Sequence, residues 1–128
     1  MSTQEKKAKL VLVGRVLSGL LVLLFTLSAG VKLFGPVDPR LATVGIPETL
    51  LIPLGILELL CVIAYLLPAT SVLGAVLFTG YLGGAILTHL RVGQSISIQV
   101  ILGTLIWAGL YLREPRLWQL LPLRRMLV

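Results

Sequence analysis

Four long apolar stretches, separated by short polar breaks, constrain this chain more than any other feature of its sequence. They cover residues 10–34, 47–67, 71–90 and 96–112. A helix needs about 20 apolar residues to cross the hydrocarbon core of a bilayer, which is close to the length of these stretches. Because backbone groups in lipid must be hydrogen-bonded within the protein, helices are the expected form. We expect an all-α integral membrane protein, an antiparallel bundle of four transmembrane helices.

The composition supports a membrane environment and one domain. Of the 128 residues, 57% are apolar and 12% are charged, whereas soluble domains have roughly 25% charged residues. We expect a transmembrane domain over residues 10–112, between a basic tail over 1–9 and a second basic tail over 113–128. The first apolar run exceeds the 7–15 residues of a signal-peptide core, so we interpret it as an uncleaved helix.

The net charge of +6 comes from basic residues at the helix ends, not from one polar face. This distribution indicates membrane topology and not a nucleic-acid partner. With the N-terminus inside, the inner ends carry Lys6, Lys7, Lys9, Arg15, Arg113, Arg116, Arg124 and Arg125, whereas the outer ends carry Lys32, Arg40 and Arg91. The positive-inside rule then favours both termini in the cytoplasm. We expect a multi-pass protein of a bacterial cytoplasmic (inner) membrane.

The breaks between helices carry further signals. Residues 35–46 contain prolines and glycines, which predict an outer loop whose middle is a short interfacial or re-entrant segment. Pro53 falls inside the second apolar stretch and predicts a kink, because proline removes a helical hydrogen bond. Residues 113–128 mix arginines with Trp118 and leucines, as in a segment that lies along the cytoplasmic interface.

Glu58 is the most unusual residue, since no other charge lies within nine positions on either side. A charge at the bilayer centre costs roughly 2.5–3.5 kcal/mol even on insertion scales. Two interpretations remain open. Glu58 has a functional role as a proton donor or acceptor, or it is a neutral acid that donates one hydrogen bond across the bundle.

Helix geometry predicts which groups meet Glu58. Lys32 and His89 lie near the outer ends of their helices, whereas Glu58 lies roughly 15 Å below the outer start of its own helix. That depth is closer to Tyr81 than to His89, and a direct bond from Glu58 to His89 requires tilted helices. We expect a pocket that opens outward, with Lys32 and His89 at its mouth and Glu58 at its floor.

Polar and small residues recur on one face of each helix, which should point into the bundle. The candidate catalytic residues are Glu58, His89 and Tyr81. The candidate ligand-binding residues are Ser28, Lys32, Gly55, Gly84, Thr88, Gln99 and Trp107. Helix packing alone is the other interpretation for the serines, threonines and glycines. One histidine and one cysteine, Cys61, provide neither a typical metal site nor a dithiol.

Two classes of function remain. The first is a module that binds a hydrophobic small molecule such as a quinone, an isoprenoid or a sterol-like lipid. No cofactor is evident, so its own chemistry would be acid–base: isomerisation, cyclisation or epoxide opening. The second is a non-catalytic accessory or scaffold subunit of a membrane oxidoreductase or assembly complex, with a membrane partner or a second copy. A proton-coupled transporter is a weaker third, because four helices would have to oligomerise.

Two segments resemble the DoxX-like family of small four-helix membrane proteins: SAGVKLFGP at residues 28–36 and PLGILELLCVIAYLLPATSVLGAVLFTGYLGGAILTHLRVG at 53–93. The matching positions are Ser28, Gly30, Lys32, Leu33, Gly55, Glu58, Leu59, Gly74, Tyr81, Gly83, Gly84, Thr88, His89 and Arg91. The resemblance implies an antiparallel bundle of four transmembrane helices. Relatives in this family include a subunit of a thiosulfate:quinone oxidoreductase and an accessory protein of methylamine dehydrogenase maturation.

Overall fold

The computed structural model describes residues 2–121, and within them the chain is helical without strands. The α-helices are α1 (Thr3–Phe34), α2 (Arg40–Thr43), α3 (Leu51–Leu66), α4 (Ser71–Leu90) and α5 (Ser97–Arg113). Short 3-10 turns cover Glu48–Leu50, Pro68–Thr70 and Pro115–Gln119. The predicted interfacial tail over 113–128 is described as far as residue 121, and its residues 122–128 lie outside the described part.

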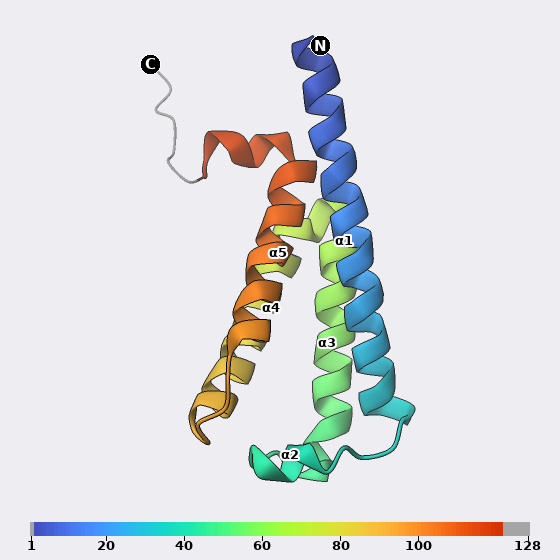
Figure 1. Cartoon of the computed structure of the whole chain (residues 1–128). Coiled ribbons are helices and arrows are strands. Elements are labelled where there is room, and N and C mark those ends of the chain that lie inside the picture. The colour runs from blue at the N-terminus through green and yellow to red at the C-terminus, as the bar shows by residue number, and fades with distance from the viewer. Residues whose placement is uncertain (1, 122–128) are drawn as a thin grey trace.

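The four long helices form a bundle in which α1 and α4 each pack against both α3 and α5. Successive long helices run in opposite directions, and α2 lies across one end of the bundle (Figure 1). The 3-10 turn Pro115–Gln119 lies across the other end, on the side of the N-terminus (Figure 1). The bundle therefore has two different ends: one beside α2 and one beside the chain termini.

The outer surface of the bundle is apolar, as lipid requires. Leucine, isoleucine and valine side chains are exposed along all four long helices. Among the described residues, three helical segments are long and apolar enough to cross a membrane: Thr3–Phe34, Glu48–Leu66 and Pro68–Leu90. The fourth, Ser97–Arg113, is apolar but shorter. The expected all-α fold of several long apolar helices is confirmed.

The first helix begins earlier than its apolar stretch predicts, at Thr3 and not at residue 10. Ser2 and Glu5 form a capping box. The Glu5 N–H donates to Ser2 Oγ and the Ser2 N–H donates to Glu5 Oε2, and each donor–acceptor distance is 3.2 Å. This reciprocal pair satisfies donors at the helix start. Most of the predicted N-terminal tail is therefore part of α1.

Pro53 lies near the start of α3 and not in the middle of a helix, where the sequence predicts it. The 3-10 turn Glu48–Leu50 precedes α3, and α3 begins at Leu51. Pro53 thus lies in the first turn of α3, where backbone N–H groups have no regular helical acceptor. The predicted mid-helix kink is wrong, and a change from 3-10 to α geometry takes its place.

The bundle is tightly packed towards the terminal end, around Tyr65. The Tyr65 hydroxyl donates to the Ile106 carbonyl oxygen at 2.7 Å and lies 3.2 Å from Ser18 Oγ. Its ring meets Phe78 edge to face, with the ring centroids 5.8 Å apart. The Arg113 guanidinium donates to the Tyr65 carbonyl oxygen and lies 4.4 Å from the centre of the tyrosine ring. These contacts join α1, α3, α4 and α5 in one buried cluster.

Gly74 sets how closely α3 and α4 approach, and this gives the first prediction. A Cβ atom at Gly74 would lie 2.2 Å from the Tyr65 backbone nitrogen, whereas one at Gly83 would meet nothing within 4 Å. We expect Gly74→Ala to destabilise the protein by about 1–3 kcal/mol through overpacking. Thermal unfolding in mild detergent measures this. Gly83→Ala, on the same helix, is the control and should keep or raise the melting temperature; equal melting temperatures for both variants would contradict the prediction.

Candidate functional site

A cavity of about 510 Å³ lies at the α2 end of the bundle. Its walls come from α1, α3, α4 and the segment between α1 and α3. The lining residues are Lys32, Leu41, Ile46, Leu50, Leu51, Leu54, Leu57, Gly80, Tyr81, Gly84, Ala85, Thr88 and His89. Most of them are apolar and a few are polar, which is the usual composition of a small-molecule site.

An ion pair with two hydroxyl partners lies beside this cavity. The Lys32 ammonium donates to Glu58 Oε2 at 2.7 Å, and the Tyr81 hydroxyl donates to the same oxygen at 3.1 Å. Lys32 also donates to Ser28 Oγ, one turn earlier on α1, at 2.7 Å. The Glu58 side chain is 1% exposed and that of Lys32 is 22% exposed. The group of four side chains joins α1, α3 and α4.

Local helix geometry explains this group. Ser28 and Lys32 are four residues apart and share one face of α1. Glu58 lies on the buried face of α3, and Tyr81 approaches it from α4. The structure therefore brings together Glu58 and Tyr81, as their depths predicted.

The positions of Lys32 and Glu58 differ from the predicted pocket. Lys32 turns inward to pair with Glu58 instead of lying at the mouth. Glu58 does not line the cavity, whereas Lys32 and Tyr81, which donate to its carboxylate, do. Glu58 Oε2 accepts hydrogen bonds from both Lys32 and Tyr81, so this oxygen is an acceptor in the group of four side chains.

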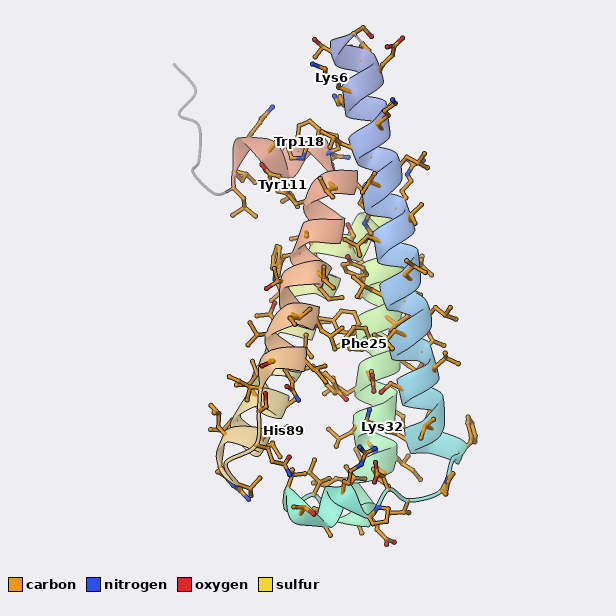
Figure 2. All side chains as sticks on the ribbon, viewed as in Figure 1. Lys6, Phe25, Lys32, His89, Tyr111 and Trp118 are labelled. Carbon is orange, nitrogen blue, oxygen red and sulfur yellow. The ribbon has the colours of Figure 1, made fainter. Side chains whose placement is uncertain are left out.

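His89 lines another part of the cavity wall, at the same end as Lys32 (Figure 2). Its Nδ1 lies 2.7 Å from the Ala85 carbonyl oxygen and 3.4 Å from Gln99 Nε2. Because a carbonyl is an acceptor, we assign the proton to Nδ1. Gln99 Oε1 is buried and has no hydrogen-bond partner among the described residues. A flip of the Gln99 amide exchanges Oε1 and Nε2, so that Oε1 accepts a hydrogen bond from the His89 Nδ1–H. The assignment leaves the ring nitrogen Nε2 for a ligand.

Of the other predicted ligand-binding residues, some line the cavity and others pack helices together. Gly84 and Thr88 line the cavity, although the Thr88 hydroxyl donates to the Gly84 carbonyl of its own helix. Gly55 instead lies against α1, where an added Cβ would be 2.8 Å from Leu33 Cγ. Ser28 does not line this cavity, but its hydroxyl oxygen accepts a hydrogen bond from Lys32, which does.

Gln99 and Trp107 lie outside this cavity. Both line a separate groove between α4 and α5, where the Trp107 indole N–H donates to Thr79 Oγ1 at 2.8 Å. Sequence spacing placed them on an inward face, but α4 and α5 approach each other along that face. The structure therefore does not bring Trp107 to Glu58. Gln99 is connected to the cavity by its contact with His89, which lines the cavity wall.

The segment around α2 contributes lining residues that we did not predict. Leu41 and Ile46 lie over the end of the cavity where we expected an open mouth. Their signal in the sequence is the apolar content of RLATVGI within a polar loop. In the same loop, hydrogen bonds from the Arg40 side chain and backbone lower the pKa of Asp38 below its usual value.

The chain is thus a membrane helical bundle with a buried ion pair beside a largely apolar cavity. The family model for the DoxX-like family matches residues 16–110, and the chain belongs to this family. The match covers most of the bundle and includes Lys32, Glu58, Tyr81 and His89. A search of curated proteins found no match, and a search of solved structures found none either. Family membership and the apolar helices identify an integral membrane protein.

The ion pair generates the second prediction. Glu58→Gln leaves the Lys32 ammonium without its carboxylate, and we expect a loss of about 3 kcal/mol, the low end for a broken buried pair, because Lys32 is partly exposed. The double variant Lys32→Met/Glu58→Gln should be more stable than the sum of the single losses, by roughly 0.5–3 kcal/mol. Unfolding in detergent measures this cycle. Additive losses would show that the two side chains do not interact.

Proposed function

We propose that this protein binds a hydrophobic small molecule with a polar oxygen atom in the 510 Å³ cavity, such as a quinone, an isoprenoid or a sterol-like lipid. The observation that carries the proposal is the Lys32–Glu58 pair at the edge of an apolar space. Ionisable groups within a membrane are rare and mark functional sites. A ligand with an apolar body and one polar end matches both parts of the cavity.

Lys32 is suited to bind the polar end of such a ligand. An ammonium group has three N–H donors, and within residues 2–121 two of them are used, by Ser28 and Glu58. The third is available for a carbonyl or hydroxyl oxygen. The Tyr81 hydroxyl donates to Glu58, so its oxygen can accept a hydrogen bond from a ligand hydroxyl.

Glu58 would act on the ligand through these two side chains. When Tyr81 takes a proton from a ligand hydroxyl, it can pass its own proton to Glu58 Oε2, with no net change of charge on the tyrosine. The reverse transfer returns the proton. This relay uses side chains of the chain alone and is compatible with acid–base reactions such as isomerisation, cyclisation or epoxide opening.

The position of the cavity favours entry from the membrane. Leu41 and Ile46 lie over its end, whereas Leu50 and Leu57 in its wall are exposed on the outer surface of the bundle. The α3 and α4 ribbons also diverge towards the α2 end (Figure 1). A lipid-soluble ligand can thus reach the wall formed by α3 and α4 without crossing water.

Retention of a ligand during purification tests this proposal. We expect the protein in mild detergent to carry one lipid-soluble compound in stoichiometric amount, identified by mass spectrometry of an organic extract. Tyr81→Phe removes one hydroxyl and should lower retention up to about tenfold, the scale of one hydrogen bond. Tyr111→Phe is the matched control, because this tyrosine bonds to Leu121 at the other end of the bundle. Equal retention by both variants, with the fold intact, would exclude the Tyr81 contact.

A second candidate function is that of an accessory subunit. The groove between α4 and α5 supports it as a surface for a partner helix. This groove is lined by Thr79, Leu82, Gly83, Ile86, Gln99, Val100, Gly103, Thr104 and Trp107. Hydroxyl groups and glycines on an outer surface suit a partner helix, since small and polar residues let membrane helices pack closely. A partner subunit or second copy that co-purifies, and whose loss follows Gly83→Leu but not Tyr81→Phe, would favour this candidate.

We also propose that all four long helices span a bacterial cytoplasmic membrane, with both termini in the cytoplasm. The 17 residues of α5 extend about 25 Å, a few ångströms less than the hydrocarbon core, and local thinning of the bilayer accommodates a span of this length. Lys6, Lys7 and Lys9 lie at the terminal end together with Arg113 and Arg116, and the positive-inside rule favours this end in the cytoplasm.

Cysteine labelling in intact cells tests this topology. Cys61 is buried, and Cys61→Ala provides a background without cysteine. In that background we expect Thr43→Cys, in the outer segment, to react with a membrane-impermeant maleimide. Gln4→Cys, near the N-terminus, should react only after the cells are opened. The reverse pattern would overturn the proposed orientation.

A further inference from the structure

A second cavity, of about 480 Å³, lies at the terminal end of the bundle, far from the Lys32–Glu58 pair. Its lining residues are Arg15, Ser18, Gly19, Leu66, Pro68, Ser71, Arg113 and Glu114. Neither the acid–base relay nor the ligand cavity uses these side chains. We name this space the arginine cleft, after Arg15 and Arg113.

We propose that the arginine cleft binds the phosphate group of an anionic phospholipid. The cleft combines two guanidinium groups, from α1 and α5, with apolar wall residues such as Leu66. Guanidinium groups pair with phosphate oxygens through two parallel hydrogen bonds, more specifically than lysine does. The apolar wall is suited to the first carbons of the lipid chains.

Arg113 is held in place for this role. Its guanidinium donates to the Tyr65 carbonyl oxygen and lies 4.4 Å from the centre of the Tyr65 ring, so its orientation is set by the packed core. A guanidinium has five N–H donors, and this one contact leaves others for a ligand in the cleft. Preorganisation lowers the entropy lost when a ligand binds.

The charges around the cleft favour an anion. Glu114 lines it as well, but its carboxylate accepts a hydrogen bond from Arg116 Nε at 3.1 Å, which offsets its charge. Within residues 2–121, Arg15 is exposed and forms no ion pair. Two arginines therefore face one compensated acid.

The position of the cleft along the membrane normal favours a lipid as the source of the phosphate. Arg15 lies 19 residues, or roughly 28 Å, before Phe34, the last residue of α1. Because the hydrocarbon core is about 30 Å thick, a helix whose α2 end lies at one interface places Arg15 near the opposite interface, where phospholipid headgroups are concentrated. Soluble phosphate shares the same chemistry, and the experiment must separate the two sources.

Native mass spectrometry of the full chain in mild detergent, titrated with phosphatidylglycerol or phosphatidylcholine, tests the proposal. We expect one phosphatidylglycerol per chain to bind at least about tenfold more tightly than phosphatidylcholine, on the scale of one charge-assisted contact. Arg15→Gln should remove most of this preference. Lys9→Gln is the matched control, because it removes the same charge from the same helix at a residue that does not line the cleft.

Three results would overturn the proposal. Equal weakening by Arg15→Gln and Lys9→Gln would indicate general surface charge, and equal binding of the two lipids would indicate no recognition of an anion. Displacement of phosphatidylglycerol by millimolar inorganic phosphate, but not by equal ionic strength of chloride, would assign the cleft to soluble phosphate. Arg113→Lys keeps the charge but loses the paired donors of the guanidinium, and should weaken phosphatidylglycerol binding more than Lys9→Gln does.

Discussion

The hydrogen-bonded ion pair between Lys32 and Glu58 is the interaction on which the α2 end of this bundle depends. A lone carboxylate inside a membrane is expensive, and so is a lone ammonium. Here each neutralises the other, and hydroxyl groups of Ser28 and Tyr81 complete the set. Since the four side chains come from three helices, the same contact that stabilises the charges also holds α1, α3 and α4 in register around the cavity.

The two ends of the bundle are built on different principles. Towards the terminal end, the rings of Tyr65 and Phe78 and the hydrogen bonds of Arg113 join the helices beside the arginine cleft, and Gly74 lets the α3 and α4 backbones meet. At the α2 end the walls are leucines and glycines around an open volume. A rigid half of this kind can hold the polar groups of the other half in fixed positions, as a binding site requires.

How much of the site could be read from the sequence depended on the reach of each side chain. The levels of Glu58 and Tyr81 followed from counting residues along helices, and those two side chains do meet. Counting residues along the helix predicts the level of the Lys32 Cα atom at the mouth, but the long Lys32 side chain extends inward to the carboxylate. Spacing alone predicts that Trp107 faces the interior, whereas the structure places it in a separate groove lined by residues of α4 and α5.

The membrane environment and the all-α fold class follow from the sequence alone, because apolar stretches of this length are stable in lipid as helices. The sequence also pointed to Glu58, since an isolated acid in an apolar run needs a partner or a task. Only the folded bundle shows that these partners are Lys32 and Tyr81, and that they line the cavity while Glu58 does not. The reason is physical: periodicity sets the face and depth of a residue, whereas helix crossing and side-chain direction decide which faces touch.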